Sequence, residues 1–549
     1  MTLMQKAYWF IAIIGNATIA YWVYADQTTP SLLFLFLTVI FTLVGFFDLF
    51  FSSHTLNRLY PVAAYIRYFL ESFRKEIHQY FIANETEELP FNREQRSLVY
   101  QRSKNERDTI AFGTQRDLTA ENYLSLWHSM APTDVKEEHK RVTIGGKSCR
   151  QPYSAAYLNV SAMSFGALSS QAIEALNLGA KKGGFYHNTG EGSVSQYHLK
   201  HGGDLVWQIG SGLFGCRTTA GEFDAERFSA MANKDQIKMI EIKLSQGAKP
   251  GHGGVLPKAK ITKEIAEIRI ISTDQDCVSP ASHPECKTPI MLLKFVETLR
   301  ELSNGKPIGF KLCLGNPAEF LSICKAMIET EIYPDFITVD GAEGGTGAAP
   351  VEFSNRLGVT CLDAVYLVNS MLIGCGLRKH IKIIAAGKTA SSFDLLSKIA
   401  VGADVVNAAR TMMMALGCIQ SQACNTNACP TGIATQDPTR GKAINIPSKG
   451  QRVANFQRNT LHAFFELLGS MGLDNPTKLT PNILKRRAAN GLTISWGAMV
   501  PLLPLNSLTD ESAIRHLDEQ WQQWWQAADS NTFYVEDSQA LHYPATKIC

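Results

Sequence analysis

The stretches IKIIAAGKT (residues 381–389) and DVVNAART (residues 404–411) each read as a short buried strand that ends in small residues and a cation. Six similar apolar runs precede them, at residues 157–163, 185–188, 206–209, 237–243, 308–313 and 336–340. Amphipathic helical patterns separate these runs, which is typical of repeated βα units. Eight such units favour an α/β fold with a closed parallel TIM (β/α)8 barrel over an open sheet, and we place this barrel at residues 117–480.

The ends of the last two strands predict a phosphate site. Ligands of TIM barrels bind at the carboxyl ends of the strands, and a phosphate commonly lies after strands 7 and 8. Small residues such as Gly387, Ala408 and Ala409 allow backbone N–H groups to approach a phosphate, and Lys388 or Arg410 would neutralise it. Each loop alone is equally compatible with an ordinary tight turn, so the prediction depends on the two occurring together.

Other strand ends carry glycine-rich or polar loops: SAMSFGA (161–167), NTGEG (188–192), QGAKPG (246–251) and DGAEGGTG (340–347). Such loops suit a flat isoalloxazine ring, which needs close backbone approach and hydrogen bonds along its edge. None of them has the strand, turn and helix context of a P-loop or a dinucleotide-binding fingerprint. The sequence therefore favours a flavin site and predicts no NAD(P)-binding domain.

Three cysteines, Cys418, Cys424 and Cys429, lie within twelve residues, and Pro430 follows the last. With twelve cysteines in the chain, such a window would hold roughly a quarter of one by chance. A proline after the last ligand is typical of ferredoxin-like cysteine runs, and three thiolates suit a 3Fe-4S cluster. Zinc would require a fourth ligand, and no histidine occurs between His380 and His462. Buried inert thiols are the remaining alternative.

The N-terminus contains two apolar runs of membrane-spanning length, residues 7–25 and 31–51. We interpret residues 1–52 as a transmembrane helical hairpin rather than a signal peptide, because the second run follows the first after five residues. Basic residues before and after the hairpin predict that both ends, and so the catalytic domain, lie in the cytoplasm. A buried soluble hairpin is the alternative, since Asn16 and Asp48 are polar.

Two further segments complete the chain. In the connector (53–116), residues 67–89 (RYFLESFRKEIHQYFIANETEEL) predict an amphipathic helix near the membrane surface or docked on the catalytic body. In the C-terminal tail (481–549), Trp521, Trp524 and Trp525 have the spacing of a helix that packs on the barrel or a partner. The net charge of +3 gives no support for nucleic-acid binding.

Several motifs together resemble a known family. SAMSFGALS (161–169), NTGEG, SQGAKPG (245–251), DGAEGGTGAAP (340–350) and CIQSQACNTNACPTGIATQDP (418–438) are similar to the FMN-binding synthase domain of glutamate synthase. The stretch FGTQRDL (112–118) extends the resemblance to the stand-alone FMN-binding glutamate synthase family proteins. The resemblance covers roughly residues 95–480 and supports the barrel.

This resemblance implies an oxidoreductase that reduces 2-iminoglutarate, formed from 2-oxoglutarate and ammonia, to L-glutamate. It implies that Cys418, Cys424 and Cys429 bind a 3Fe-4S cluster. The residues expected around FMN are Ala162, Met163, Ser164, Glu191, Gln208, Lys311, Gly341, Gly344, Gly345, Gly387, Lys388, Ala408, Ala409 and Arg410. Lys311 would stabilise the anionic edge of reduced FMN, and Glu191 is the second catalytic candidate. Arg217, Lys243 and Lys249 are the candidates for binding the substrate carboxylates.

The chain also departs from large glutamate synthases. It lacks their N-terminal glutaminase and a pyridine-nucleotide-oxidising partner domain, so we expect an external electron donor such as ferredoxin or a separate reductase subunit. Ammonia would come from solution or from a separate glutaminase. The alternatives are an FMN and iron–sulfur oxidoreductase with a different amino or keto substrate, and an electron-transfer subunit without synthase activity.

Overall fold

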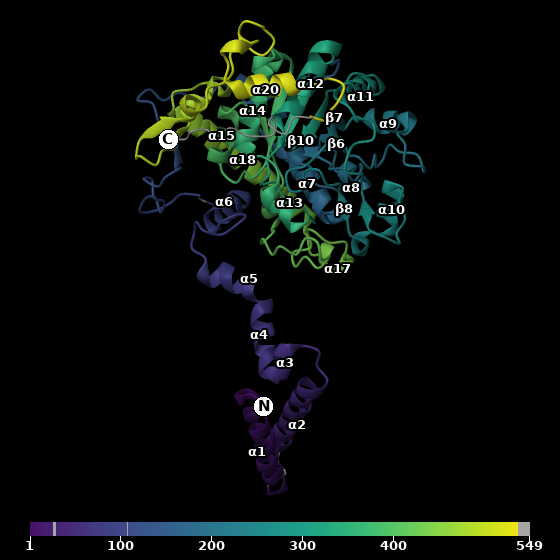
Figure 1. Ribbon diagram of the computed structural model, residues 1–549, viewed down its shortest axis with the longest axis vertical. Coiled ribbons are helices and arrows are strands. Elements are labelled where there is room, and N and C mark those ends of the chain that lie inside the picture. Colours follow the sequence, from purple (N-terminus) through teal and green to yellow (C-terminus); the bar gives the residue numbers. More distant parts are fainter. Residues whose placement is uncertain (26–28, 107, 536–549) are drawn as a thin grey trace. The chain divides into compact units, whose positions relative to one another are not determined.

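The computed structural model describes residues 1–25, 29–106 and 108–535, and the chain divides into two compact units between Arg93 and Glu94 (Figure 1). The first unit contains the two apolar N-terminal helices. The second contains the predicted barrel. We describe each unit separately.

The second unit is built on a closed barrel of eight parallel strands. The strands are β4 (Leu158–Val160), β5 (His187–Asn188), β6 (Leu205–Ile209), β7 (Ile237–Lys243), β10 (Ile308–Leu312), β11 (Phe336–Asp340), β12 (Lys382–Ala386) and β13 (Val405–Ala408). They neighbour one another in chain order, and β13 pairs with β4 to close the barrel. All eight predicted runs thus coincide with barrel strands, and the predicted TIM barrel is confirmed.

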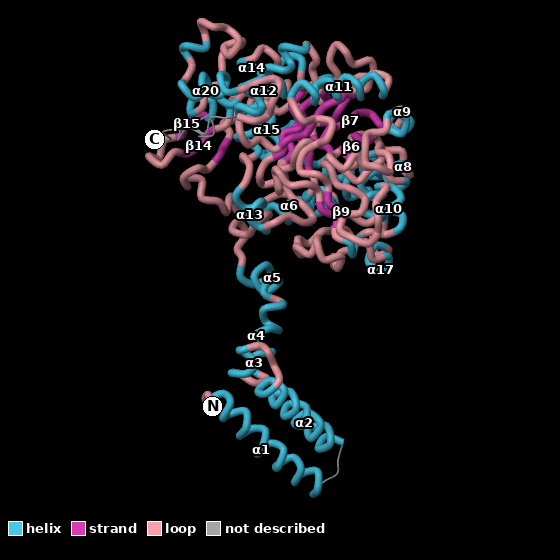
Figure 2. The backbone as a smooth tube through the Cα atoms, turned by 45° about the vertical axis from the view of Figure 1, so that its right-hand side comes forward, coloured by secondary structure: helices cyan, strands magenta, loops and turns pink. Residues whose placement is uncertain are grey.

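Helices surround these strands, as Figure 2 shows for the second unit. They are α7 (Ser170–Gly183), α8 (Gln196–Leu199), α9 (Ala225–Ala232), α11 (Pro289–Leu302), α12 (Pro317–Thr330), α14 (Cys361–Gly374), α15 (Ser392–Ala400), α16 (Arg410–Leu416) and α18 (Ile446–Ser470). Between β7 and β10 the chain adds α10 (Lys263–Arg269) and the strand pair β8 (Val255–Leu256) and β9 (Cys277–Val278). Short helices α13 (Val351–Arg356) and α17 (Pro438–Gly441) lie in later loops.

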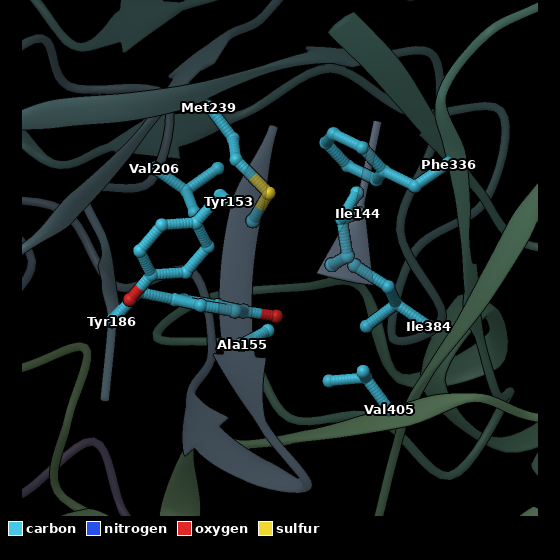
Figure 3. Packing of buried hydrophobic residues seen from close by; sticks show 9 residues of the cluster. All are labelled: Ile144, Tyr153, Ala155, Tyr186, Val206, Met239, Phe336, Ile384 and Val405. Carbon is cyan, nitrogen blue, oxygen red and sulfur yellow. The ribbon is translucent and has the colours of Figure 1, made fainter. Parts of the chain in front are cut away.

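A β-hairpin closes the amino-terminal end of the barrel. Strands β2 (Arg141–Ile144) and β3 (Tyr153–Ala156) pair just before β4. They contribute to a buried cluster, shown in Figure 3, of Ile144, Tyr153, Ala155, Tyr186, Val206, Met239, Phe336, Ile384 and Val405. Phe336 and Val405 are the first residues of their strands, so this cluster fills the barrel at that end. A ligand site is therefore confined to the opposite, carboxyl end.

Residues 94–116, which the sequence places in the connector, belong to the barrel unit. Helix α6 (Arg93–Lys104) lies against the barrel: Arg102 donates from Nη1 to the Ser392 hydroxyl at 3.1 Å. Arg116 forms an ion pair with Glu94 at 2.7 Å. Arg102 and Ser392 are far apart in the sequence, so composition alone could not place the boundary between the connector and the barrel unit.

The tail packs as its tryptophan spacing predicts. Trp524 of α20 (Glu519–Ala527) is buried, and the Lys325 ammonium of α12 lies 4.7 Å from the centre of the Trp525 ring. The tail also adds β14 (Lys485–Arg487), β15 (Thr493–Ser495) and α19 (Trp496–Met499), with β14 pairing to β1 (Leu124–Ser125). Residues 536–549 of the predicted tail segment lie outside the described residues.

The N-terminal unit begins with α1 (Leu3–Ala25) and α2 (Thr29–Phe50), which pack side by side (Figure 2). Both are long and apolar enough to cross a membrane. The Tyr8 ring fills the space beside Gly45, where a Cβ would come within 2.0 Å of it. Asn16 donates to the Thr42 hydroxyl at 2.6 Å, so this polar side chain is satisfied inside the pair.

Short helices follow this hairpin. They are α3 (Thr55–Leu59), α4 (Ala63–Ser72), α5 (Arg74–Ile77) and the π-helical turn η1 (His78–Ile82). The sequence predicts one amphipathic helix over residues 67–89, whereas the structure ends helical geometry at Ile82. Within that span Phe73 (φ −105°, ψ 8°) separates α4 from α5.

Candidate functional site

A cavity opens at the carboxyl ends of the barrel strands. Its walls come from the loops after β4, β5, β7, β11 and β13, and from strand residues that point to that end. The predicted residues that line it are Ala162, Met163, Ser164, Glu191, Gln208, Lys243, Lys249, Lys311, Gly345, Ala409, Arg410 and Cys424. The barrel therefore gathers residues from across the chain into one site.

Two buried ion pairs lie in the wall of this cavity. Lys243 and Lys311 are neighbours in the register of β7 and β10. Lys243 lies 3.0 Å from Glu191, and Lys311 lies 3.1 Å from Asp340. Burial alone would raise the pKa of Glu191, but the nearby ammonium of Lys243 holds that pKa below its usual value. Burial likewise opposes the charge of Lys311, yet the Asp340 carboxylate raises the pKa of this lysine, which favours its charged form.

Lys249 and Arg269 add two more cations. Burial, together with the charge of Lys243, lowers the pKa of Lys249 to about 8, and its Nζ donates to the Ala348 carbonyl at 2.8 Å. Arg269 is only 4% exposed and donates from Nη2 to the Phe165 carbonyl at 3.0 Å. Its Nε atom is buried and has no hydrogen-bond partner among the described residues. The cavity thus carries more positive than negative charge and suits an anionic ligand.

Arg269 is a site residue that the sequence reasoning missed. It lies on the buried face of α10, four residues after the buried Ile265, and an arginine on an apolar helix face was the available signal. Arg217, by contrast, was predicted for the substrate but is not among the residues that line the cavity. Its guanidinium lies 5.7 Å from the centre of the Phe214 ring and donates to the Gly212 carbonyl at 3.1 Å.

A second missed residue, Glu241, fixes Gln208. Glu241 is buried in the middle of β7 and accepts from Gln208 Nε2 at 2.6 Å and from Asn188 Nδ2 at 2.9 Å. The Thr338 hydroxyl donates to its other oxygen. Because the amide N–H of Gln208 is engaged, its carbonyl oxygen is the atom left to accept a hydrogen bond from a ligand.

The predicted phosphate end combines tight turns with two cations. A Cβ on Gly345 would lie 2.7 Å from Arg410 Cδ, so a larger residue there would displace the Arg410 side chain. Burial lowers the pKa of Lys388, and the charge of Arg410 lowers it further, which means that the two cations lie near each other. The Arg410 guanidinium donates to the Glu343 carbonyl. Gly341, Gly344, Gly387 and Lys388 follow the ends of β11 and β12, and Ala408 is the last residue of β13; none of them is among the residues that line the cavity.

The cysteine loop adjoins the same cavity. It follows α16, and Cys424 is part of the cavity wall. The buried Lys260 holds the loop: its Nζ donates to the carbonyls of Cys424 at 2.7 Å, Ala434 at 2.9 Å and Ala167 at 3.1 Å. Tyr100 of α6 donates its hydroxyl to the Cys418 carbonyl at 2.7 Å.

The donor chemistry of this loop fits an iron–sulfur cluster. Burial alone would raise the pKa of Cys429, but hydrogen bonds from the Thr431 hydroxyl and nearby backbone N–H groups lower it, which favours a thiolate. Burial raises the pKa of Cys418 to about 11 and also raises that of Cys424, so these two thiols would lose their protons to bound iron rather than before it binds. In residues 1–25, 29–106 and 108–535, no three His, Cys, Asp or Glu side chains are close enough to hold a single metal ion. A cluster places each thiolate on a different iron, so its ligands lie farther apart than those of one ion.

Comparison with known proteins assigns the family. Residues 92–474 match the family described as "Conserved region in glutamate synthase". The chain belongs to the glutamate synthase family. The match starts at residue 92, so residues 1–91 of the N-terminal unit lie outside it.

Two relatives illustrate the similarity. This glutamate synthase family protein is 35% identical over 485 residues to the Glutamate synthase large subunit-like protein YerD of Bacillus subtilis (strain 168), across 81% of this chain and 92% of that one. It is 35% identical over 323 residues to the Archaeal glutamate synthase (NADPH) of Archaeoglobus fulgidus, across 59% of this chain and 60% of that one. A crystal structure of mandelate oxidase aligns at 14% identity and a TM-score of 0.38, over 64% of this chain and 84% of that one, too distant to bear on function.

Proposed function

We propose that this glutamate synthase family protein is an FMN- and 3Fe-4S-dependent oxidoreductase that forms L-glutamate. In the reaction, 2-oxoglutarate and ammonia lose water to give 2-iminoglutarate, and two electrons and two protons reduce its C=N bond. The electrons come from an external donor. The observation that carries this proposal is the cationic cavity at the barrel mouth, whose wall includes a cysteine of the triplet.

The charge of the cavity supports a dicarboxylate substrate. Lys243 and Lys311 each have a carboxylate partner, whereas Lys249 and Arg269 are held by backbone carbonyls. These last two cations therefore remain available to neutralise two carboxylates. A monocarboxylate or an uncharged substrate would leave one of them buried without a counter-charge, which is costly.

The chain's own residues also fit FMN. Gly387, Ala408 and Ala409 would present backbone N–H groups to its phosphate, with Lys388 and Arg410 as the neighbouring cations. Gln208 would offer its carbonyl oxygen to the flavin edge, and Lys311 would place positive charge beside that ring. FMN supplies a hydride donor when bound, and the cluster supplies a one-electron relay. Lys260 and Tyr100 keep the cysteine loop beside the flavin site.

We propose that α1 and α2 anchor the protein in a membrane with the barrel in the cytoplasm, as the basic residues flanking the hairpin predict. The expected partners are a ferredoxin-like protein or a separate reductase subunit as electron donor. A separate glutaminase would supply ammonia where free ammonia is scarce. In this arrangement, the donor must deliver electrons one at a time to the cysteine loop.

The proposal is tested with the purified full-length protein. We expect a flavin absorbance band and about three irons per flavin. Dithionite-reduced protein mixed with 2-oxoglutarate and ammonia should reoxidise and release glutamate. Reoxidation by another keto acid but not by 2-oxoglutarate would instead favour a different amino or keto substrate. A coloured protein that no keto acid reoxidises would favour an electron-transfer subunit.

A further inference from the structure

One exposed apolar stripe in the N-terminal unit has no role in the proposed reaction. Helices α4 and α5 and the turn η1 follow one another from Ala63 to Ile82 with a single break at Phe73 (Figure 1). The Phe73 N–H donates to the Leu70 carbonyl at 3.3 Å at the end of α4, and the Phe73 carbonyl accepts from the Ile77 N–H at 2.9 Å at the start of α5. The segment therefore consists of two helical pieces joined at Phe73, about five turns in all.

The apolar side chains of this segment recur at the three- and four-residue spacing of one helical face. They are Ile66, Phe69, Leu70, Phe73, Ile77 and Phe81, and all are exposed, from 36% for Ile77 to 85% for Phe81. Monomeric soluble proteins rarely leave such a contiguous apolar surface uncovered.

The opposite face is polar and basic. It carries Arg67, Arg74, Lys75 and His78, and Arg74 forms an exposed ion pair with Glu71 at 3.2 Å. Arg67 and Lys75 form no ion pair with any described residue of the chain. An exposed apolar stripe opposite unpaired basic side chains is the pattern of helices that lie in the interfacial layer of a membrane.

Hydrogen bonds to a buried carboxylate hold the start of this segment against the hairpin. Asp48, near the end of α2, is fully buried and accepts from the Val62 N–H at 2.9 Å and from the Tyr65 hydroxyl at 2.9 Å. Asn57 donates to the same carboxylate at 3.3 Å. The start of α4 is therefore held at the end of a helix long enough to span a bilayer, where a bilayer surface would lie.

We propose that residues 63–82 lie in the interfacial layer of a bilayer that contains anionic phospholipid. The apolar stripe is submerged among acyl chains, and Arg67 and Lys75 contact anionic headgroups. This inference rests on the proposed membrane insertion of α1 and α2 but not on the reaction of the barrel. The alternative is that protein covers the apolar stripe, either the barrel unit or a second copy of the chain.

Hydrogen exchange of the full-length protein distinguishes these alternatives. The protein is compared in detergent, in vesicles of phosphatidylcholine, and in vesicles with about one third phosphatidylglycerol. We expect amides of residues 66–82 to exchange about tenfold more slowly in the anionic vesicles than in detergent, with a smaller effect in phosphatidylcholine. Replacing Arg67 and Lys75 by glutamine should remove the difference between the two lipids.

Matched variants report on the stripe itself. Phe69→Gln with Phe73→Gln should restore fast exchange of residues 66–82 in vesicles. Tyr68→Gln, an exposed aromatic residue on the other side of the helix, should leave the protection unchanged. Protection of α1 and α2, together with the flavin absorbance, shows whether each variant is inserted and folded.

Two results would overturn the proposal. Fast exchange of residues 66–82 in vesicles, while α1 and α2 are protected, would mean that the hairpin inserts but this segment does not touch lipid. Equal protection in detergent and in both vesicle types, unchanged by Phe69→Gln with Phe73→Gln, would mean that the stripe is not what holds this segment against lipid.

Discussion

Arg269 is the side chain we expect to discriminate most strongly between substrates. Arg269→Lys keeps the charge but loses the planar pair of N–H donors that matches a carboxylate. We expect KM for 2-oxoglutarate to rise roughly 10- to 100-fold with a smaller change in kcat, as measured in steady-state assays with a reduced donor. The matched control is Arg217→Lys, because that guanidinium also lies over the Phe214 ring but outside the cavity lining. Equal effects of both variants would contradict the assignment.

Lys249 gives the site a pH dependence. Its pKa lies at about 8, so the ammonium is present below that pH and is lost above it. If Lys249 binds a substrate carboxylate, kcat/KM for 2-oxoglutarate should fall by about tenfold per pH unit above about pH 8. Lys249→Arg keeps its charge throughout this range and should remove that inflection, whereas Lys249→Gln should give a low and flat profile. An unchanged inflection in both variants would assign it to another group.

The family resemblance pointed to Lys311 and Glu191, and Lys243 was a candidate from its place near a barrel loop. The structure brings these three residues into one cavity, because a barrel places every strand end on one face. Arg269 and Glu241 were missed. In the sequence, each resembles an ordinary residue of a helix or strand. Their roles depend on contacts with distant residues: Arg269 contacts Phe165, and Glu241 contacts Gln208.

At the scale of elements, α6 braces the cysteine loop. Tyr100→Phe removes its hydrogen bond to the Cys418 carbonyl while keeping the ring. We expect iron to be lost to a chelator roughly 2- to 10-fold faster, since such a bond is worth about 1 kcal/mol. The flavin content should not change. The control is Tyr534→Phe, at an exposed position; identical iron loss from both variants would show that α6 does not stabilise the loop.

The predicted elements were accurate where periodicity was strong. All eight barrel strands overlap the predicted runs, because most are apolar segments bounded by small or polar turn residues. The connector was less predictable. Its boundary depends on contacts such as that of Arg102 with Ser392, 290 residues apart, which no local pattern reports.

At the scale of the whole molecule, the proposed function has electrons pass from the cysteine loop to the barrel mouth. Cys424→Ser should abolish iron binding and reduce ferredoxin-driven turnover by at least about 100-fold, while FMN remains bound. Iron analysis and flavin absorbance on the same sample separate these effects. Cys149→Ser, at a partly exposed thiol outside the loop, is the control. Full ferredoxin-driven activity in iron-free protein would show that electrons enter the flavin directly.

The two-unit organisation predicts where the protein is found in the cell. Full-length protein should remain in the membrane pellet after washing with alkaline carbonate, because most apolar side chains of α1 and α2 are exposed among the described residues. A chain lacking residues 1–52 should leave that pellet. Release of the full-length protein by carbonate would contradict membrane insertion.

The side-by-side placement of Lys243 and Lys311 also constrains how this site changes in evolution. Glu191 and Asp340 each neutralise one member of a pair of adjacent ammonium groups. Losing either acid would leave unpaired charge in the barrel, at a cost of several kcal/mol, about 3 to 5. These four positions should therefore covary among homologues: lineages that have replaced Glu191 are expected to have replaced Lys243 as well.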